Sequence, residues 1–594
     1  MKQFLKQTLA SFIGSVAGLL FLFALSTGGL FLFIMALMLS SNNPQIENQS
    51  VLVFDLSSQI TDSNNQRPLP AFLNPESSNN LSLRQVINAI NKGAEDKKIS
   101  ALFLDGSKGN INLGYGSLAE LKTALENFKS SGKKIITYHN SISEKDYYLS
   151  SIADEINLNP LGALEMNGLS TSQLFFASAL DKYGIGVQVI RVGKYKSAVE
   201  PFTRDNYSTE NREQTKELLT NLWDSYLNEV SENNGLTSQN INNIADSFGI
   251  IEAKKAQELK LIDKTAYIDE IRDDFRTITN TEKDNFPQVT IKQYLSRTTT
   301  NQGAENKIAI LYLEGNIVDG EGNIGEVGGL RTVAEIKKIR EDENIKGVIV
   351  RINSPGGSAL ASELIARELD ITAQEKPIVI SMADVAASGG YWIATSGEKI
   401  FANDGTITGS IGVFGLLFNL ENLTKNNGIN SDVIKTNQLA DLSNNFRSKN
   451  PQEIAVYQES VNQIYDLFLE RVAKARNLSI QEVNNIAQGR VWLGNNAQEI
   501  GLVDDIGGLE SAINYLTEKL TLGDNYEIKE YPELRNWENE LLTAIENTDL
   551  AQNKLDSIAI FNQIWEYNSD LDLANILKKP NRVYSILPFK FDIN

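Results

Sequence analysis

Apolar residues recur along most of the chain with two spacings, which predict different secondary structures. Short continuous apolar runs, typical of buried strands, occur at residues 102–104, 134–138, 308–313, 348–352 and 378–381. Longer stretches with apolar residues every three or four positions, typical of amphipathic helices, occur at residues 118–128, 213–230, 361–373 and 454–475. Strands that alternate with helices in this way predict an α/β fold.

The longest apolar run, residues 12–39, is 28 residues without a charge. At ~1.5 Å per residue such a helix is about 42 Å long, enough to cross a ~30 Å hydrocarbon core with tilt. Lys2 and Lys6 precede the run and the next basic residue is Arg67. The positive-inside rule then puts the N-terminus in the cytoplasm and the bulk of the chain outside. We expect a single-pass anchor; the alternative is a cleaved signal peptide, whose apolar region is about 7–15 residues.

The rest of the sequence repeats itself at a nearly constant spacing. Residues 147–149 resemble 391–393, and residues 188–191 resemble 432–435, both 244 positions apart. Residues 242–245 return as 484–487, and residues 256–263 as 497–504. A tandem duplication explains similarities at this long period. We expect a stub and anchor over 1–45, a first copy over 46–285, a linker over 286–306, a second copy over 307–525 and a C-terminal tail over 526–594.

Composition excludes several classes of chemistry. Among 594 residues there are 55 Lys and Arg against 75 Asp and Glu, a net charge of −20 that disfavours nucleic acid as a partner. No cysteine is present, which excludes disulfides, thiolate catalysis and cysteine-ligated metals. His139 is the single histidine, and it follows an apolar strand, where a packed or capping role is more common than catalysis. We expect no metal and no cofactor, and a hydrolase with this composition needs a base other than histidine.

Two glycine-rich loops follow predicted strands in the second copy. They read N-S-P-G-G-S at 353–358 and A-A-S-G-G-Y-W at 386–392. A strand, a tight turn and a helix can aim backbone N–H groups at an anion or a developing oxyanion, which makes Ser388 a candidate nucleophile. The alternative is that these loops only reverse the chain. The first copy lacks both glycine pairs and has Glu144 where the second has Ser388, or Ser143 if a one-residue gap is allowed.

The first copy carries a candidate base instead. Lys196 lies in R-V-G-K-Y-K-S-A-V-E-P-F and falls on Ala440 at the 244-residue spacing, so each copy holds one half of a Ser/Lys pair. Because the reference pKa of lysine is about 10.4, Lys196 can act as a base near neutral pH only if burial lowers its pKa. Ser410 is a candidate to aim the amine. The alternative is an ordinary surface lysine.

Four segments then resemble a known family. N-S-P-G-G-S, A-A-S-G-G-Y-W, T-G-S-I-G-V-F-G and Y-K-S-A-V-E-P-F resemble, in order, the signature segments of the signal peptide peptidase A family in its long bacterial form. The resemblance covers nearly the whole chain. It implies a ClpP/crotonase-like fold in each copy, a homotetramer, and a membrane-anchored serine protease that uses a Ser/Lys dyad to degrade cleaved signal peptides.

The same resemblance assigns roles to residues. It implies that Ser388 is the nucleophile, that Lys196 is the general base and that Ser410 orients the lysine. Gly356 and Gly357 would line the oxyanion hole, and we place Gly389 with them as a substrate-binding candidate.

We therefore expect a serine endopeptidase at the outer, periplasmic face of the bacterial inner membrane. Its substrates would be signal peptides or other apolar extended peptides, and residues 12–39 would contact the bilayer. One alternative is a catalytically silent, membrane-tethered scaffold that binds peptides. Another is acyl-CoA chemistry, which an external location disfavours because CoA is cytoplasmic. The sequence leaves open whether Ser388 and Lys196 meet within one chain or between chains.

Overall fold

The computed structural model describes residues 46–63, 80–282, 285–297, 303–533 and 583–586. The predicted anchor, residues 12–39, lies outside the described residues, and so does most of the predicted tail. Among the helices that are described, none is both long and apolar enough to cross a membrane. The structural account below concerns residues from Gln49 onward, which form one unit.

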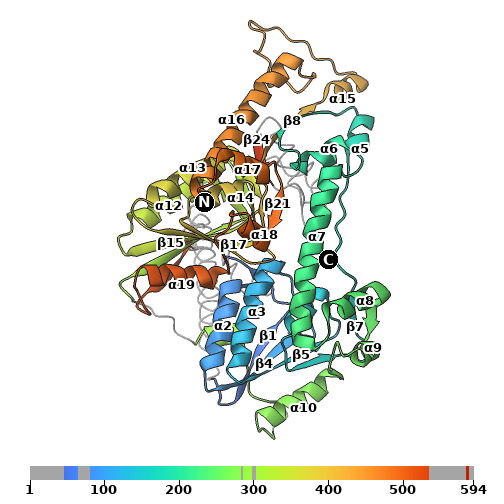
Figure 1. Ribbon diagram of the computed structural model, residues 1–594, viewed down its shortest axis with the longest axis vertical. Helices are drawn as coiled ribbons and strands as arrows, with labels where there is room; N and C mark the ends of the chain where they lie inside the picture. The colour runs from blue at the N-terminus through green and yellow to red at the C-terminus, as the bar shows by residue number, and fades with distance from the viewer. Residues whose placement is uncertain (1–45, 64–79, 283–284, 298–302, 534–582, 587–594) are drawn as a thin grey trace, which may run out of the picture. The chain divides into compact units, whose positions relative to one another are not determined.

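Two parallel sheets with the same strand order form the two copies (Figure 1). The first has the order β10-β6-β5-β4-β1-β11, built from β1 (Ser50–Asp55), β4 (Ile99–Gly106), β5 (Lys134–His139), β6 (Glu155–Leu158), β10 (Lys264–Thr265) and β11 (Gln288–Thr290). The second has the equivalent order β22-β18-β17-β15-β12-β23, built from β12 (Lys307–Glu314), β15 (Ile345–Ser354), β17 (Ile378–Ala387), β18 (Lys399–Ala402), β22 (Asp505–Ile506) and β23 (Glu527–Tyr531). Two further strands extend the second sheet, β19 (Ile407–Gly409) and β21 (Val491–Leu493). β19 pairs with the last three residues of β17, and β21 pairs with β19.

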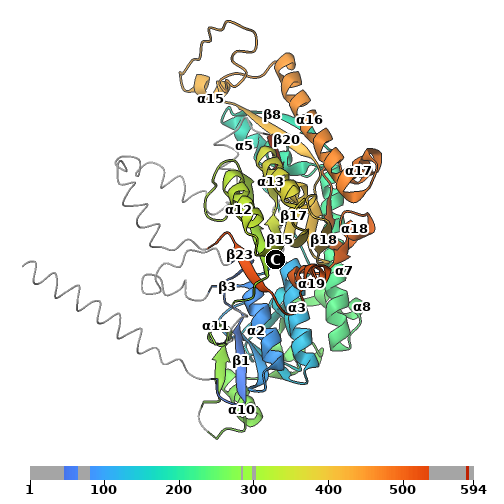
Figure 2. The ribbon, with the colours of Figure 1, turned by 90° about the vertical axis from the view of Figure 1, so that its left-hand side faces the viewer.

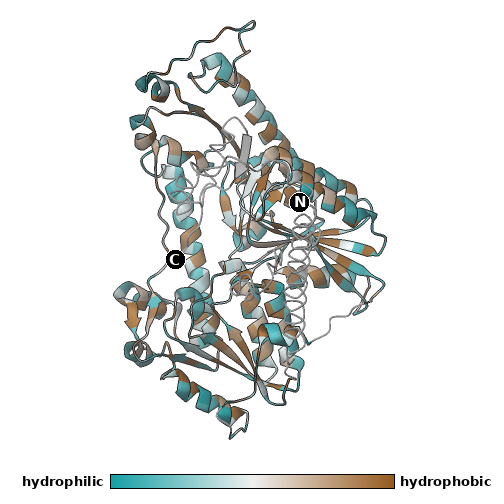
Figure 3. Cartoon of the chain, turned by 180° about the vertical axis from the view of Figure 1, so that it is seen from behind, coloured by the Kyte–Doolittle hydropathy of each residue, from teal (hydrophilic) through white to brown (hydrophobic). Residues whose placement is uncertain are grey.

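The second sheet is covered on both faces, which explains its continuous apolar strands. Leu311 and Val350 pack into a core with helices on one face, and their neighbours Ile310 and Ile349 pack into a separate core on the other. Burial on both faces is usual for parallel sheets and removes the polar alternation of a half-exposed strand. Strands coloured brown, with helices in mixed colours around them, show this pattern in Figure 3.

Helices connect the strands in both copies. In the first copy they are α2 (Leu83–Glu95), α3 (Tyr115–Ser130), α4 (Glu144–Ser150), α5 (Ala177–Lys182), α6 (Glu200–Thr203), α7 (Thr209–Asn234), α8 (Ser238–Phe248), α9 (Ala253–Glu258), α10 (Ile268–Ile278) and α11 (Ile291–Leu295). In the second they are α12 (Gly329–Glu341), α13 (Ala359–Thr372), α14 (Gly389–Ala394), α15 (Glu421–Asn426), α16 (Pro451–Arg476), α17 (Ile480–Ile486), α18 (Gly494–Glu499) and α19 (Leu509–Lys519). All nine predicted strands and helices fall on observed elements of the expected type. Figure 2 shows α12 and α13 on one side of β15 and β17 and α19 on the other.

Matching hydrogen bonds support the duplication. The Tyr147 hydroxyl donates to the carbonyl of Leu261 at 2.8 Å, and the Tyr391 hydroxyl donates to the carbonyl of Leu502 at 2.8 Å. The two tyrosines are 244 positions apart and the two leucines are 241 positions apart, as the repeat predicts. One pair of repeated segments differs in structure: residues 188–191 lie in β8 (Gly186–Val192), whereas residues 432–435 are irregular and exposed.

The copies extend further than the predicted boundaries. β11 pairs with β1 and α11 follows it, so residues 288–295 belong to the first copy and not to a linker. β23 pairs with β12, which extends the second copy past residue 525. Both strands are short or rich in charge, and therefore lack the apolar run by which the other strands were predicted.

A third sheet joins the two copies. Its order is β14-β13-β16-β24-β20-β8, with β13 (Asn316–Val318), β14 (Glu326–Gly328), β16 (Gly356–Ser358), β20 (Val413–Asn419) and β24 (Val583–Ile586). β8 comes from the first copy and the other strands from the second copy and the tail. Two small sheets complete the described structure, β2 (Ile60–Thr61) with β3 (Leu81–Ser82) and β7 (Ala163–Met166) with β9 (Gly249–Glu252).

Candidate active site

The pairing of β8 with β20 brings the first copy's lysine to the second copy. The two strands are antiparallel, and Val192 at the end of β8 lies opposite Val413 at the start of β20. The residues that follow Val192 therefore lie beside the residues that precede Val413. As a result Nζ of Lys196 is 3.0 Å from both Oγ and the carbonyl oxygen of Ser410.

Ser388 reaches the same point from the end of β17. It precedes α14 and has φ 55° and ψ −113°, a backbone conformation that residues with a side chain rarely adopt. Its N–H donates to the carbonyl of Gly409 at 2.8 Å, and its carbonyl accepts from the N–H of Trp392 at 2.8 Å. Such strain costs roughly 1–3 kcal/mol and is found mainly at functional sites. Oγ of Ser388 lies 2.7 Å from Nζ of Lys196, within one chain.

Burial favours the neutral form of Lys196. Lys196, Ser388 and Ser410 are all fully buried. In the part of the chain that the structure describes, Lys196 forms no ion pair with a carboxylate, and desolvation lowers its pKa well below the ordinary value for lysine. A neutral amine has two N–H groups and one lone pair. It can therefore donate to the two Ser410 oxygens and accept the proton of the Ser388 hydroxyl, the arrangement of an activated nucleophile.

The glycine-rich loops flank this pair. Gly389 is the first residue of α14, and β16, which contains Gly356 and Gly357, packs against α14. Gly357 has φ 155°, and a Cβ there would collide with the carbonyl of Ile317 in β13, so only glycine fits. The three glycines predicted from sequence thus lie on the two elements that border Ser388.

Comparison with known proteins agrees with this geometry. The family model described as "Peptidase family S49" matches residues 127–281 and again residues 370–523, together more than half of the chain. The chain belongs to peptidase family S49. The two matches are offset by 242 to 243 residues, the period seen in the sequence.

Three relatives of the S49 chain illustrate the similarity. "Protease 4" of Salmonella typhi is 35% identical over 494 residues, which cover 80% of this chain and 79% of that protein. "Serine protease SPPA, chloroplastic" of Arabidopsis thaliana is 33% identical over 493 residues, 82% of this chain and 71% of that protein. "Putative signal peptide peptidase SppA" of Enterococcus faecium is 38% identical over 236 residues, 39% of this chain and 69% of that protein. The S49 chain is therefore a serine protease, a hydrolase.

The equivalent position in the first S49 copy has no such pair. Glu144, which stands where the second copy has Ser388, is buried, and its carboxylate accepts N–H groups of Asn167 and Gly168 at 2.6 and 2.7 Å. Ser143 caps α4 and donates to Asp146 at 2.5 Å. Neither alignment of the repeat therefore places a serine beside a lysine in the first copy.

His139 is a packed residue. It is fully buried, its Nε2 lies 2.9 Å from Oγ of Ser150, and desolvation lowers its pKa to about 3. This buried imidazole ends β5 in the first sheet, whereas Ser388 follows β17 in the second sheet. The prediction that it packs and does not catalyse agrees with this environment.

Two features near the site were not predicted from the sequence. Gly489 has φ 78°, and a Cβ there would lie 2.6 Å from the Cβ and backbone nitrogen of Lys196. The carbonyl of Gln488 accepts the N–H of Tyr195 at 2.9 Å. The loop before β21 therefore holds the segment that carries Lys196. The sequence Q-G-R at 488–490 predicts a turn, but it does not predict a contact with Lys196, which is almost 300 positions away.

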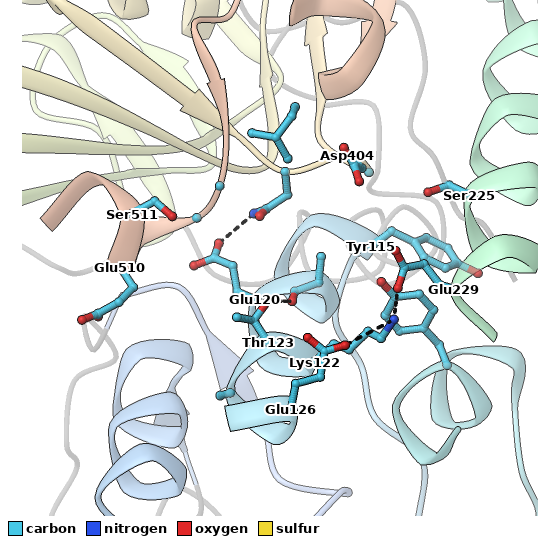
Figure 4. A pocket seen from close by; sticks show the side chains of 18 of the residues that line it. Tyr115, Glu120, Lys122, Thr123, Glu126, Ser225, Glu229, Asp404, Glu510 and Ser511 are labelled. Carbon is cyan, nitrogen blue, oxygen red and sulfur yellow. Dashed lines mark hydrogen bonds and ion pairs between the residues drawn. The ribbon is translucent and has the colours of Figure 1, made fainter. Parts of the chain in front are cut away.

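A cavity of about 460 Å³ lies between α3, α7 and the second copy, and its lining contains none of the dyad residues. Figure 4 shows Lys122 of α3 in this cavity, paired with Glu229 of α7 and with Glu126. Burial lowers the pKa of Lys122, and the carboxylates of Glu126 and Glu232 oppose this effect. Lys122 therefore has the environment of an ion pair, in contrast to Lys196.

The apolar residues next to the site belong mostly to the core. Val413, Phe414 and Leu416 are fully buried, and the last two pack with Ala198 and Val199 beside the lysine segment. Val385 is half-buried. The first three side chains are therefore part of the interior, and the backbone of β20 pairs with β8 and β24.

Proposed function

We propose that this S49 protease is a membrane-anchored endopeptidase that uses Ser388 as nucleophile and Lys196 as general base. The observation that carries the proposal is the 2.7 Å contact between Oγ of Ser388 and Nζ of a lysine that is fully buried and lowered in pKa by burial. Ser410 holds the amine with two oxygens, as a residue that orients the lysine should.

The reaction follows from these positions. The lone pair of Lys196 takes the proton of Ser388, and Oγ attacks the scissile carbonyl carbon. N–H groups of Gly357 and Gly389 stabilise the oxyanion, an effect worth about 10²–10³ in rate per donor, whereas the N–H of Gly356 donates to Oγ of Ser354 at 3.2 Å. The Lys196 ammonium then protonates the leaving amine as the peptide bond breaks. Water, deprotonated by Lys196, attacks the acyl-enzyme ester, and Ser388 recovers its proton as the acid product leaves.

We further propose that the substrates are cleaved signal peptides or similar apolar peptides, and that the site lies on the periplasmic side of the bacterial inner membrane. The uncharged run at residues 12–39, preceded by Lys2 and Lys6, supports the anchor and its orientation. The names of relatives such as the Enterococcus faecium protein support the substrate class. The ClpP/crotonase-like classification of each copy and the homotetramer belong to the same proposal, and neither nucleic acid nor a cofactor has a role in it.

Peptide cleavage tests the function. The full chain in detergent would be incubated with a synthetic peptide that has an uninterrupted leucine-rich core, and with a peptide of equal length whose leucines are replaced by serines. We expect products from the apolar peptide only, and a rate at least about 10³-fold lower for Ser388→Ala, because removal of a catalytic nucleophile leaves little more than binding and the oxyanion hole. Equal cleavage of both peptides would contradict the substrate class. Binding of the apolar peptide without any product would favour the silent scaffold.

The anchor and its orientation need a separate test. A bacterium that expresses the full chain would be converted to spheroplasts and treated with an external protease. We expect the chain to sediment with membranes and its bulk to be digested from outside. A chain that stays soluble, or that is protected until the spheroplasts are lysed, would contradict the location.

A further inference from the structure

A strand from the tail lies beside the catalytic elements. β24 pairs antiparallel with β16 on one side, where Ile586, Ser585 and Tyr584 lie opposite the successive residues Gly356, Gly357 and Ser358. On its other side β24 pairs antiparallel with β20, with Tyr584 opposite Phe414 and Val583 opposite Gly415. β24 is therefore the strand that links β14-β13-β16 to β20-β8 in the joint sheet (Figure 1). Without it, a gap one strand wide separates β16 from β20.

The two walls of this gap carry the proposed catalytic groups. β16 begins at the glycines assigned to the oxyanion hole, and β20 begins three residues after Ser410. A peptide bound in the gap would bond through its backbone to both walls, and strand addition of this kind accepts many sequences because the main chain supplies the affinity. An endopeptidase that degrades varied peptides requires such a mode of binding.

The direction of β24 is that of a substrate. Because β24 is antiparallel to β16, it runs from Ser358 towards Gly356, and Ile586 is the residue opposite the first glycine. The acyl half of a substrate must likewise run towards the oxyanion hole, where its last carbonyl is attacked. The sequence V-Y-S-I is also of the apolar kind proposed for the substrates.

We propose that residues 583–586 occupy the backbone position of the substrate, so that the protein's own tail competes with peptides for the active site. The proposal rests on the proposed function, because it takes the gap beside Ser388 to be the substrate site. Because the tail is part of the same chain, its binding is intramolecular and acts at a high effective concentration compared with a free peptide. When only a fraction of molecules has an open site, the apparent dissociation constant of the substrate rises by the inverse of that fraction.

Cysteine pairing tests where the strand lies, independently of activity. The chain contains no cysteine, so an introduced pair is unambiguous. Gly415→Cys with Val583→Cys, in the Ser388→Ala background to keep the chain intact, joins residues that are directly opposite and therefore about 4.5–5.5 Å apart, within the reach of a disulfide. The matched control, Asn419→Cys with Val583→Cys, lies four residues further along β20, about 13 Å away. We expect rapid disulfide formation in the first pair only; no disulfide, or equal formation in both, overturns the proposal.

Kinetics test the competition. Ser585→Pro removes a backbone N–H from the middle of β24, where proline is not tolerated between two neighbouring strands, and Ser585→Ala keeps that N–H. We expect Ser585→Pro to lower the KM for the apolar peptide several-fold at unchanged kcat, and Ser585→Ala to match the wild type. An active enzyme whose KM does not respond to Ser585→Pro overturns the competition and leaves the proposed function intact. Loss of all cleavage in the wild type would instead count against the proposed function, and the cysteine pair would still locate the strand.

Discussion

At the scale of single residues, the proposed mechanism depends on a lysine whose neutral form is favoured by burial. Lys196 has hydroxyl and carbonyl oxygens around Nζ, whereas Lys122 in the cavity of Figure 4 has carboxylates. A carboxylate would hold the proton on the amine, and burial among neutral groups removes it. The difference between a base and an ion pair is therefore set by the partners of each lysine and not by burial alone.

This environment predicts the pH dependence of the rate. Because the folded protein lowers the pKa of Lys196, the active, neutral amine forms as pH rises through that lowered pKa, and kcat/KM should rise with it and then level off well below pH 10.4. The same sign holds for stability: the unfolded chain binds the proton more tightly, so the contribution of Lys196 to folding improves as pH rises between the lowered and the ordinary pKa. Measurement of kcat/KM for the apolar peptide over pH 5–10 checks this. A rate that rises only near pH 10 would contradict it.

At the scale of elements, four segment ends meet at one point. The end of β8, the end of β17, the start of β20 and the turn before β21 each contribute a residue or a contact to the dyad. Loops at the ends of well-packed strands commonly carry catalytic groups because the sheet fixes their positions. Gly489 has no side chain that could take part in the reaction, so the turn contributes only its contact with Lys196.

Substitution of Gly489 should therefore reduce catalysis through Lys196. Gly489→Ala places a methyl group 2.6 Å from Lys196, and a shift of about 1 Å in a catalytic group can lower the rate about 10²-fold. Gly501 is a matched control, since its φ of 80° resembles the 78° of Gly489 but nothing lies within 4 Å of a Cβ there. We expect kcat to fall roughly 10- to 100-fold in Gly489→Ala and to stay near the wild-type value in Gly501→Ala. Equal effects on kcat would show that backbone strain, and not contact with Lys196, is responsible.

At the scale of the whole molecule, the site exists because two copies are joined. In addition to the pairing of β8 with β20, a buried arginine links the two copies. Arg351 of β15 donates to Asp62 at 2.9 Å and to Glu120 of α3 at 2.7 Å, both in the first copy. Glu120 also accepts from Asn403 and from the N–H of Leu509, both in the second copy. In the proposed mechanism the first copy supplies the base and the second copy supplies the nucleophile.

Loss of the arginine should weaken this junction. Arg351→Met leaves two buried carboxylates without their partner, which typically costs about 3–5 kcal/mol of folding free energy. Arg340→Met is the control, because Arg340 pairs with Glu368 at a partly exposed position where an ion pair is worth about 1 kcal/mol or less. Urea unfolding would compare the two. Similar midpoints for both variants would contradict a special role for Arg351.

The α/β class and the duplication could be predicted from the sequence, because apolar runs and repeated segments can be recognised without a structure. Apolar runs identify strands such as β12, and two glycine-rich loops identify the surroundings of Ser388. The sequence did not predict β11 or β23, which carry too few apolar residues to stand out, or β24, which is only four residues long. Nor did it predict the link between Arg351 and Glu120, whose partners are 231 positions apart. It also left open whether the dyad forms within one chain. Only the antiparallel register of β8 against β20, a long-range feature, places Lys196 beside Ser388 in the same chain.

The most direct test of the dyad is covalent labelling of the detergent-solubilised full chain with a fluorophosphonate, followed by peptide mass analysis. The reagent would be applied to the wild type, Ser388→Ala, Lys196→Met and Ser362→Ala, the last being another fully buried serine of the second copy. We predict label on Ser388 in the wild type and in Ser362→Ala, and none in the other two variants, because a serine without its base is not nucleophilic. Label on a different serine, or label on Ser388 that persists in Lys196→Met, would contradict the Ser388–Lys196 dyad.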